Sequence, residues 1–445
     1  MFLNTCILAL CWAFVNTGAT RFDKLKITCD NAGHMSKNLN QKETFHNLGI
    51  VPALLSRLTE MGFVEPTPIQ LKAIPVATAG EDVVGIAQTG SGKTLAFSIP
   101  MIQSLGATKK MGLILLPTRE LAVQVEETLR GIAGAKGLRT ALVIGGINAR
   151  PQVRQLAQKP HIIVATPGRL LDHVEQKNIS LANVGMLVLD EADRMLDMGF
   201  APQLNRILAY VPADRQTMLF SATMPDEITK IAQKYMKKPL RIEVARPGTT
   251  ADTIDQEIFI VEKKDKLSLL GKLLNEYKGA ILVFSRTKHG AKKIAAAIRT
   301  KGHSADELHS NRSQSQRQQA LKGFERGLYR ILVATDIAAR GIDVDNIELV
   351  INFDLPSQTD DYTHRIGRTG RAGRSGKAVS FAEPDQNDDI VKIQELIKMI
   401  LPIKSPSGHT LPPVKKDGRS KARNKGQGNS GGRRRDDRGG RRGRR

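Results

Sequence analysis

The chain of 445 residues is long enough for two or three domains. Lysine and arginine number 67 against 44 aspartate and glutamate residues, and the net charge of +23 indicates a polyanionic partner: RNA, DNA or an anionic membrane face. Aromatic residues make up only 4%, which favours contacts to a nucleic-acid backbone over extensive base stacking. All three cysteines precede Met35, and no later apolar run approaches the roughly 18 residues of a membrane helix. Disulfides, Cys-bound metals and a membrane-embedded transporter are therefore excluded for the bulk of the chain.

Residues 1–34 differ in character from the rest of the chain. A short apolar run at 7–15, followed by small residues at 17–19, resembles the apolar region and cleavage site of a secretory signal. No lysine or arginine precedes Arg21, so the basic start of such a signal is missing. We favour a start codon assigned too far upstream, with the protein beginning at Met35, and a signal-like segment remains the alternative.

Short apolar runs alternate with helical patterns from residue 35 to 245. Several runs are apolar throughout, which indicates strands buried on both faces of a parallel sheet. Helical patterns lie between them, as at Arg119–Gly131 and Pro225–Lys237. The alternation predicts a first α/β domain whose sheet is covered by helices. Its expected strands are Asp82–Ile86, Gly112–Leu116, Thr140–Ile144, Ile162–Ala165, Met186–Leu189 and Thr217–Phe220.

A second unit of the same class follows a breaker cluster at 246–253, which we interpret as an interdomain linker. The alternation restarts over 254–401. The expected strands there are Gln256–Val261, Ala280–Phe284, Ile331–Ala334, Leu349–Phe353 and Ala378–Phe381.

The C-terminal residues 402–445 are rich in glycine, proline and arginine and contain no aromatic residue. From position 404 onward, fifteen lysines and arginines stand against three aspartates. Such a segment cannot bury enough apolar surface to fold, so we expect a disordered tail. The block of one charge sign favours contact with nucleic acid over a merely solubilising end.

A phosphate-binding loop is indicated directly after the first expected strand. The segment reads AQTGSGKT, which fits the pattern with alanine in place of the first glycine. Gly90 and Gly92 let backbone N–H groups face phosphate oxygens, Lys93 supplies positive charge, and the Thr94 hydroxyl can ligate Mg²⁺. The predicted loop consists of Ala87, Gln88, Thr89, Gly90, Ser91, Gly92, Lys93 and Thr94.

A carboxylate cluster, Asp190-Glu191-Ala192-Asp193, follows the apolar strand at 186–189. A carboxylate at the end of a buried strand, beside a phosphate loop, is typical of a second magnesium-binding element. Asp190 would hold the metal through water, and Glu191 could orient and deprotonate the attacking water. A solvated helix cap is the alternative for this motif alone.

With both motifs present, the chain resembles the DEAD-box RNA helicases from Phe45 to about Phe381, most of all the bacterial RhlE-like group. Gly62-Phe63 and Pro66 to Gln70 resemble the Q motif, with Phe45 as its upstream aromatic. One departure is Ser310 after His309, where relatives usually carry glycine, and the serine could strain a turn. The other motifs follow in family order: Pro117–Ala122, Gly145-Gly146, Thr166–Arg169, Ser221–Thr223, Val283–Thr287, Gln314 with Arg317, Ala334–Asp343 and His364–Arg371.

The resemblance implies two tandem RecA-like domains and a cytoplasmic, ATP-dependent RNA helicase with a monomeric core. Such an enzyme closes on ATP and Mg²⁺, hydrolyses ATP when RNA is bound, and separates short RNA duplexes or remodels ribonucleoprotein. Partners in RNA decay or ribosome assembly would fit, and no membrane is expected. Little sequence preference is expected, because the RNA face implied by the resemblance reads no base edges. That face consists of Pro117, Thr118, Arg119, Gly145, Gly146, Arg169, Arg286, Arg317 and Thr335.

The resemblance also assigns roles around the nucleotide. Gln70 would read the adenine edge, Phe45 would stack on the base, and Asp343 would accept hydrogen bonds from the ribose. The catalytic set would be Lys93 and Glu191 with two arginine fingers, Arg368 and Arg371, and coupling to RNA would involve Asp193, Ser221, Thr223 and His364.

Simpler roles compete with several of these assignments. Phe45 could be plain core packing, Arg368 and Arg371 could bind RNA phosphates, and His364 could be structural. For the whole chain, the rivals are a nucleotide-gated RNA clamp without useful unwinding, a DNA helicase, and a basic scaffold with a dead ATPase. The intact Lys93 and Glu191 argue against the scaffold.

Overall fold

The computed structural model describes residues 44–87, 90–244, 254–339, 344, 346–359, 361–370, 375–412 and 414. The leader at 1–34, the linker at 246–253 and the segment from 415 onward lie outside the described residues, as do four predicted site residues, Gln88, Thr89, Asp343 and Arg371. We call residues 44–244 the first domain and residues 254–414 the second domain.

The described residues of the first domain form a seven-stranded parallel sheet in the order β3-β4-β2-β5-β6-β1-β7. Strand β4 is apolar and buried at every position, as a central parallel strand must be. The strands are β1 (Val83–Ile86), β2 (Met111–Leu115), β3 (Thr140–Val143), β4 (Ile162–Ala165), β5 (Val184–Leu189), β6 (Gln216–Ser221) and β7 (Leu240–Glu243).

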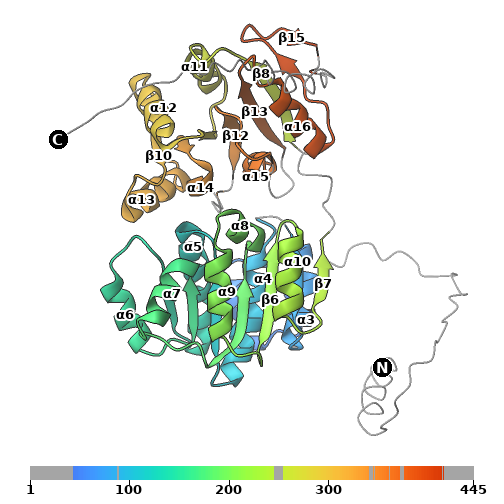
Figure 1. Cartoon of the computed structure of the whole chain (residues 1–445), viewed down its shortest axis with the longest axis vertical. Coiled ribbons are helices and arrows are strands. Elements are labelled where there is room, and N and C mark those ends of the chain that lie inside the picture. Colours follow the sequence, from blue (N-terminus) through green and yellow to red (C-terminus); the bar gives the residue numbers. More distant parts are fainter. Residues whose placement is uncertain are drawn as a thin grey trace, which may run out of the picture. The chain divides into compact units, whose positions relative to one another are not determined.

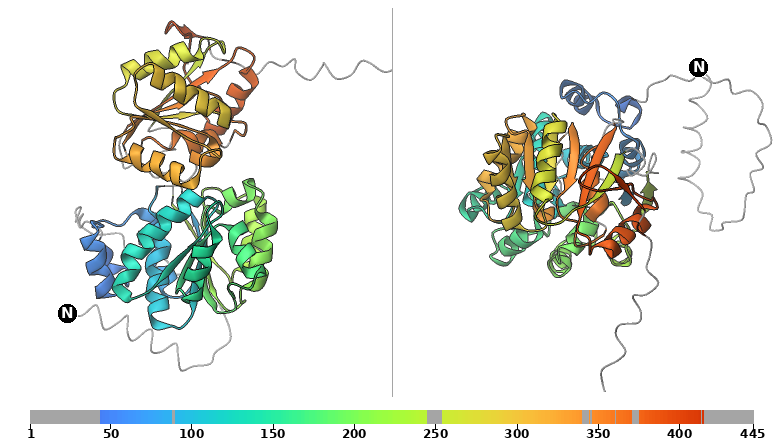
Figure 2. Two further views of the ribbon diagram at one scale, coloured as in Figure 1. Left: turned by 90° about the vertical axis from the view of Figure 1, so that its left-hand side faces the viewer. Right: turned by 90° about the horizontal axis from the view of Figure 1, so that it is seen from above.

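Helices cover both faces of this sheet (Figures 1 and 2). One apolar core lies under α2 to α5, and the other lies under α7 to α10. The helices are η1 (Phe45–Asn47), α2 (Pro52–Glu60), α3 (Pro68–Thr78), α4 (Lys93–Ala107), α5 (Arg119–Ala133), η2 (Gly134–Lys136), α6 (Ala149–Ala157), α7 (Pro167–Glu175), α8 (Ala192–Asp197), α9 (Ala201–Tyr210) and α10 (Asp226–Tyr235).

The described residues of the second domain form an eight-stranded sheet in the order β10-β11-β9-β12-β13-β8-β14-β15. Only the pairing of β14 with β15 is antiparallel. The strands are β8 (Ile254–Ile260), β9 (Ala280–Phe284), β10 (Ala305–Leu308), β11 (Ile331–Ala334), β12 (Ile347–Asn352), β13 (Gly376–Ala382), β14 (Ile403–Lys404) and β15 (Thr410–Leu411).

Helices again cover both faces of the second sheet. Helices α11 and α12 pack on one apolar core, and α13 to α16 pack on the other. They are α11 (Lys266–Glu276), α12 (Lys288–Thr300), α13 (Gln314–Glu325), α14 (Asp336–Ala339), α15 (Asp361–Ile366) and α16 (Asn387–Ile397). The prediction of two α/β units with mostly parallel sheets is confirmed, and each expected strand is present to within a few residues.

Four strands lacked the continuous apolar run on which the prediction depended. Strand β7 exposes every residue except Ile242, and β14 and β15 have two residues each. Strand β10 is buried throughout although it contains Asp306 and Glu307. Its carboxylates are compensated by arginines, Arg312 for Asp306 and Arg299 for Glu307. Because its buried charges are paired, this strand needs no continuous apolar run, and a search for such runs does not detect it.

The predicted start of the disordered tail at residue 402 is wrong. Ile403 is 1% exposed and belongs to the core of the second domain, and the Ile258 backbone N–H donates to the Pro402 carbonyl at 2.9 Å. Lys404 forms an ion pair with Glu257. Leu411 and Val414 pack against the same core. A short hairpin thus extends the sheet before the basic segment begins.

The backbone strain considered for Ser310 is absent. Ser310 is exposed and has no positive φ, whereas six other non-glycine residues among those described do. A serine therefore fits the turn after β10 without the left-handed conformation that would favour glycine.

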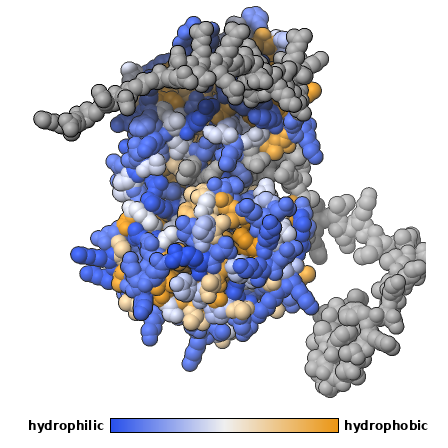
Figure 3. All heavy atoms as spheres, viewed as in Figure 1, coloured by the Kyte–Doolittle hydropathy of each residue, from blue (hydrophilic) through white to orange (hydrophobic). Residues whose placement is uncertain are grey.

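The face of the molecule drawn in Figure 3 is largely hydrophilic, with hydrophobic residues in limited areas of both domains. Large exposed apolar side chains such as Val64, Leu328 and Ile400 are scattered. Within the described ranges, no helix is both long and apolar enough to cross a membrane.

Ending the chain after Leu401 should destabilise the second domain, because the cut removes Ile403 and the Pro402 carbonyl that pairs with β8. We expect the free energy of unfolding to fall by about 3 kcal/mol, the typical cost of losing a large buried apolar side chain. A chain that ends after Val414 keeps the hairpin and should unfold like the full chain. Denaturant unfolding of the three chains tests this, and equal stabilities for the two cuts would contradict it.

Candidate nucleotide and RNA site

A pocket of about 530 Å³ lies where β1 and β5 end, at the carboxyl edge of the first sheet. This edge is where open α/β sheets bind ligands, because the loops after parallel strands meet there. The second domain contributes Glu325 and Arg368 to the lining. The pocket brings together the predicted residues Gln70, Gly90, Gly92, Lys93, Thr94, Asp190, Glu191 and Arg368.

Lys93 begins helix α4 directly after Gly92, whose φ of +87° turns the loop into the helix. The Lys93 side chain is 5% exposed, and its Nζ lies 3.7 Å from Asp190 Oδ1. No hydrogen-bond acceptor reaches Nζ in the described structure. A buried ammonium without an acceptor is costly, and phosphate oxygens at the start of a helix would satisfy it.

The pKa values of the two carboxylates after β5 are shifted in opposite directions. Burial raises the pKa of Asp190 to about 6, although Lys93 opposes the rise. Burial also acts to raise the pKa of Glu191, but the positive charges of Arg194, Lys93 and Arg368 outweigh it and lower that pKa to about 2. Glu191 Oε2 accepts a hydrogen bond from Arg194 at 2.7 Å, and Oε1 has no partner. The pocket therefore contains an ionised carboxylate with one unused oxygen.

The residues present fit a magnesium–nucleotide complex. Thr94 and Asp190 both line the pocket, and a buried carboxyl whose pKa is raised would be stabilised by a nearby cation. Among the described residues, no group of three or more His, Cys, Asp or Glu side chains could hold a metal by itself. A cation there would need phosphate oxygens and water as further ligands, which suits Mg²⁺.

Gln70 ties the Q motif to the phosphate loop. Its Oε1 accepts from the Thr67 backbone N–H at 2.9 Å, and its Nε2 donates to the Gly92 carbonyl at 2.9 Å. A Cβ atom at Gly92 would lie only 2.4 Å from that Nε2, so glycine is required for this approach. An amide has a second N–H and a second lone pair, which leaves capacity for a base edge.

The aromatic residue that lines the pocket is Phe63, whereas Phe45 is 4% exposed and packs in the core of the first domain. In this arrangement Phe45 has the place of a core residue, and its stacking role remains a prediction. The sequence signal for Phe63 was available, since it follows Gly62 within the quoted Q motif.

Asp193 connects the carboxylate cluster to the strand end at β6. Its Oδ2 accepts from the backbone N–H groups of Ala222 and Thr223 and from the Thr223 hydroxyl, at 2.9–3.1 Å. The Asp193 backbone N–H donates to the Ser221 hydroxyl at 3.2 Å. These contacts join three of the four predicted coupling residues, Asp193, Ser221 and Thr223, into one hydrogen-bond network.

The second domain contributes His364 and Arg368 to the same region. Burial lowers the pKa of His364 to about 4, and Arg194 lowers it further while Asp193 opposes the change. Arg368 Nε donates to the His364 carbonyl at 3.2 Å. The charge of Arg368 also lowers the pKa of Glu191, which indicates how close the two domains come here.

Arg365 is 2% exposed and was not among the site residues predicted from the sequence. It forms a two-pronged ion pair with Asp336 and donates to the Asn352 side chain and the Asp354 carbonyl. Its guanidinium also lies 5.0 Å from the centre of the Phe284 ring. Arg365 is the first of three arginines in the motif HRIGRTGR, and only the two later ones were predicted to be site residues. Arg365 fixes the helix that carries His364.

Three arginines of the predicted RNA face lie near one another. Burial lowers the pKa of Arg119, and the like charges of Arg317 and Arg169 add to the effect. Arg317 pairs with Glu120 at 3.1 Å, and Arg169 donates to the Ile147 carbonyl at 3.2 Å. Such crowding of positive charge favours an anion.

Gly145 and Gly146 leave the space that the Arg119 guanidinium occupies. A Cβ atom on Gly146 would lie 1.8 Å from an Arg119 terminal nitrogen, and Gly146 has a φ of +72°. Gly145 also borders the guanidinium, at 3.3 Å.

The other predicted RNA residues lie at strand ends and helix starts. Thr118 caps α5 by accepting from the Leu121 N–H, and Pro117 beside it is buried. Arg286 follows β9 and donates to the Leu355 carbonyl at 3.5 Å, while Thr335 follows β11 and its N–H donates to the Leu308 carbonyl.

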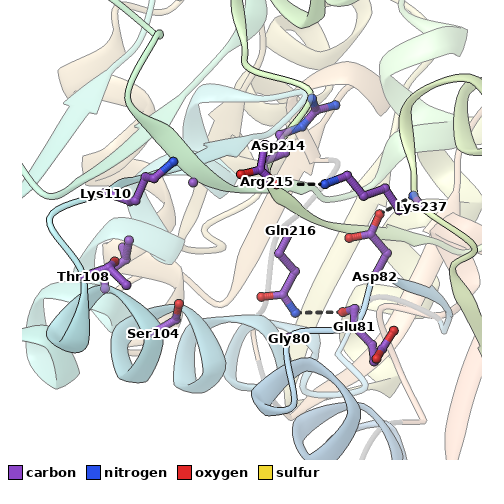
Figure 4. A pocket seen from close by; sticks show the side chains of 12 residues that line it. Gly80, Glu81, Asp82, Ser104, Thr108, Lys110, Asp214, Arg215, Gln216 and Lys237 are labelled. Atoms are coloured by element: carbon purple, nitrogen blue, oxygen red, sulfur yellow. Dashed lines mark hydrogen bonds and ion pairs between the residues drawn. The ribbon is translucent and has the colours of Figure 1, made fainter. Parts of the chain in front are cut away.

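A second pocket of about 370 Å³ lies at the opposite, amino-terminal edge of the first sheet (Figure 4). Its charged groups largely satisfy one another. Lys237 Nζ donates to Asp214, and Asp82 accepts from the Thr217 and Lys237 backbone N–H groups. Gln216 donates to the Ala77 and Glu81 carbonyls. Internal pairs thus hold several of its polar groups, and none of the site residues predicted from the sequence lines it.

Gly146→Ala should weaken RNA binding, because the new methyl group must displace the Arg119 guanidinium. The loss of one charge-assisted contact should raise the RNA concentration for half-maximal ATP turnover about tenfold, with maximal turnover retained. Gly134→Ala is the matched control, since its Cβ would meet no atom within 4 Å. RNA titrations of ATPase activity measure both variants, and equal behaviour of the two would contradict the expectation.

The DEAD/DEAH box helicase domain matches residues 67–231, and the helicase conserved C-terminal domain matches residues 265–373. The ATP-dependent rRNA helicase RRP3 of Debaryomyces hansenii is 44% identical over 82% of this chain and 77% of that protein. RRP3 of Candida albicans is 45% identical over 81% of this chain and 68% of that protein.

Solved structures give the same result. Dbp5 of S. cerevisiae, bound to RNA and ADP BeF3, superimposes with a TM-score of 0.73 at 29% identity, over 82% of this chain and 96% of that one. Mss116p bound to single-stranded RNA and AMP-PNP has a TM-score of 0.75 at 29% identity, over 83% of this chain and 80% of that one. Identity above 40% over four fifths of the sequence, with every motif in order, shows that the chain belongs to the DEAD-box family of RNA helicases.

Proposed function

We propose that Lys93, Glu191 and Arg368 carry out the ATP hydrolysis of this RNA helicase, and that its RNA is ribosomal RNA during ribosome assembly. One observation supports the catalytic assignment above the others. An arginine of the second domain lines the same pocket as the phosphate-loop lysine and the carboxylates of the first domain. Hydrolysis then depends on how the two domains meet, which is what a motor driven by ATP requires.

Each residue has a chemical task in this proposal. Lys93 binds terminal phosphate oxygens, and the free Oε1 of Glu191 orients the water and takes its proton as the water oxygen bonds to the γ-phosphorus. The bond between the γ-phosphorus and the bridging oxygen breaks, which releases ADP and phosphate. Arg368 offsets the negative charge that develops on the phosphoryl oxygens. Mg²⁺, held by Thr94 and Asp190, would supply further neutralisation of the phosphates.

Arg371, as a second finger, and Asp343, as the ribose contact, belong to the same proposal and lie outside the described residues. Gln70 has a larger role than reading a base. Because its amide holds the Gly92 carbonyl, its loss should loosen the phosphate loop as well as weaken adenine selection.

The link to RNA runs through Asp193. Its bonds to Ser221 and Thr223 join the carboxylate cluster to the loop after β6, and His364 lies beside it. Closure of the pocket on ATP would therefore also set the position of the RNA-facing arginines. The pairing of Arg317 with Glu120, which joins α13 to α5, supports this, because it connects the RNA faces of both domains.

The ribosomal substrate rests on the names of relatives. The RRP3 proteins are named as rRNA helicases, and those of Debaryomyces hansenii, Candida albicans and Scheffersomyces stipitis match 82%, 81% and 82% of this chain. These relatives give no support to the bacterial RhlE-like subgroup expected from the sequence. A cytoplasmic location and a monomeric core stay predictions, as does RNA binding by the basic C-terminal segment.

Glu191→Gln should bind ATP but hydrolyse it about 10² times more slowly or worse, because the amide cannot take the proton. The unmodified chain should hydrolyse ATP faster with RNA than with DNA and should separate a short RNA duplex. Glu60→Gln, an exposed carboxylate on α2, is the control and should keep full activity. ATPase and strand-displacement assays test this together. RNA-stimulated turnover without strand separation would favour the clamp, and unchanged turnover in Glu191→Gln would remove that residue from its role.

Crosslinking in cells, followed by sequencing of bound RNA, should enrich ribosomal RNA and its precursors above messenger and transfer RNA. The Glu191→Gln chain is the better bait, because slow hydrolysis should hold the RNA in the closed complex. An RNA profile that merely follows cellular abundance in both chains would contradict the ribosomal assignment while leaving the helicase activity standing.

A further inference from the structure

Helix α12 carries an unusual concentration of positive charge. Its thirteen residues read KHGAKKIAAAIRT and include four lysines and arginines, one histidine and no acidic residue. None of the motif residues assigned to ATP or RNA lies within it, so the function described above does not use this helix.

The charged residues share one side of the helix. Ala291, Ile294, Ala295 and Ile298 are buried against the sheet. At 3.6 residues per turn, Lys288, His289, Lys292 and Lys293 fall within an arc of about 140° on the opposite side. All four are exposed. We call these four residues the α12 basic face; Figure 1 shows the helix on the outside of its sheet.

The α12 basic face has no compensating acid. Among the described residues, none of its four side chains forms a hydrogen bond or ion pair, apart from what solvent provides. Other surface helices offset their charge within one turn, as Arg57 with Glu60 in α2 and Lys392 with Asp389 in α16. Like charges four residues apart, as Lys288 and Lys292 are, work against helix stability. Folding alone gives no reason for this arrangement.

The position of the helix points to the partner. The helix starts two residues after Arg286, and Thr287 caps it by accepting from the Gly290 N–H. Lys292 and His289 lie close enough to His309, just after β10, to help lower its pKa, although burial is the larger cause. The α12 basic face therefore starts two residues after Arg286 of the predicted RNA face and follows the helix from there toward the end of β10.

The composition of the face distinguishes RNA from a protein partner. The face consists of lysine and histidine, and the other exposed residues of α12 are Ala296, Arg299 and Thr300. The helix therefore exposes no large apolar side chain that could anchor a protein interface. Flexible lysines that bind as point charges suit a phosphate backbone, which needs no fixed register.

We propose that the α12 basic face binds the phosphate backbone of RNA that extends beyond the stretch held by the helicase motifs. The proposal rests on RNA being the substrate. It assigns to α12 a second, sequence-blind contact that holds the flanking part of a long RNA while the motif residues hold the strand at the centre.

The test replaces two lysines that lie away from the motifs. Lys292→Gln with Lys293→Gln removes two charges and retains helix-forming side chains. The matched control, Lys230→Gln with Lys234→Gln on the exposed side of α10, removes the same charge from a helix that begins with Asp226 and Glu227. Both variants are made in the full chain, and their thermal unfolding should equal that of the unmodified protein.

RNA affinity is measured by fluorescence anisotropy over a range of salt concentrations, with a non-hydrolysable ATP analogue. One RNA is the shortest that fully stimulates ATP turnover, and the other is extended on both sides. With the long RNA, the α12 variant should bind more weakly and its salt dependence should flatten by about 1.4 log units per log unit of salt, the loss of two phosphate contacts on a single strand. With the short RNA it should match the unmodified chain, and the α10 control should match it with both.

Three outcomes would overturn the proposal: equal losses in both variants, which would indicate overall charge; an equal loss with short and long RNA; or no loss with either. If RNA of no length stimulated ATP turnover in the unmodified chain, that result would count against the proposed function instead.

Discussion

Buried charge at the carboxyl edge of the first sheet is the constraint on which the rest of the structure depends. Lys93, Asp190, Glu191 and Arg194 are each at most 5% exposed. Removing such ions from water costs several kcal/mol each unless partners restore the lost interactions. The ion pairs among these four residues restore only part of the lost interactions with water, because Lys93 Nζ and Glu191 Oε1 have no hydrogen-bond partner among the described residues. A nucleotide with its metal would supply the missing partners of these buried charged groups. The site would therefore be stabilised when its substrate binds.

The same constraint explains why the second domain matters to the chemistry. Arg368 approaches Glu191 closely enough to help lower the pKa of that carboxyl, and His364 is kept neutral by burial among like charges. Both depend on α15, which Arg365 fixes through Asp336, Asn352 and Asp354. Arg365 therefore holds the helix that directly precedes Arg368, and the core of the second domain would be linked to the reaction if Arg368 has the catalytic role that we propose.

Much of the fold followed from sequence because the central strands are apolar at every position, as in β4 and β11. Where strands carry paired charges or span two residues, as in β10 and β14, no local pattern separates them from loops. The phosphate loop and the carboxylate cluster were predicted because each is a short contiguous segment, and the order of residue types within it already indicates which groups can bind phosphate or metal. The hydrogen bond from Gln70 to the Gly92 carbonyl was missed, because it is a contact across 22 residues of sequence. Phe63 was passed over although it lies in the Q motif, because only the structure shows which aromatic residue lines the pocket.

Positive charge serves two separate purposes in this chain. Arg119 is held in place by a glycine pair and is partly desolvated, so it can contact one phosphate in a defined position. The lysines of the α12 basic face are exposed, so under our proposal they raise the affinity for a nearby phosphate backbone without fixing its register. If both proposals hold, the two kinds of contact would respond differently to the nucleotide. The positioned contacts would depend on how the two domains meet at the pocket, while the diffuse ones would keep the RNA close to the protein without that condition.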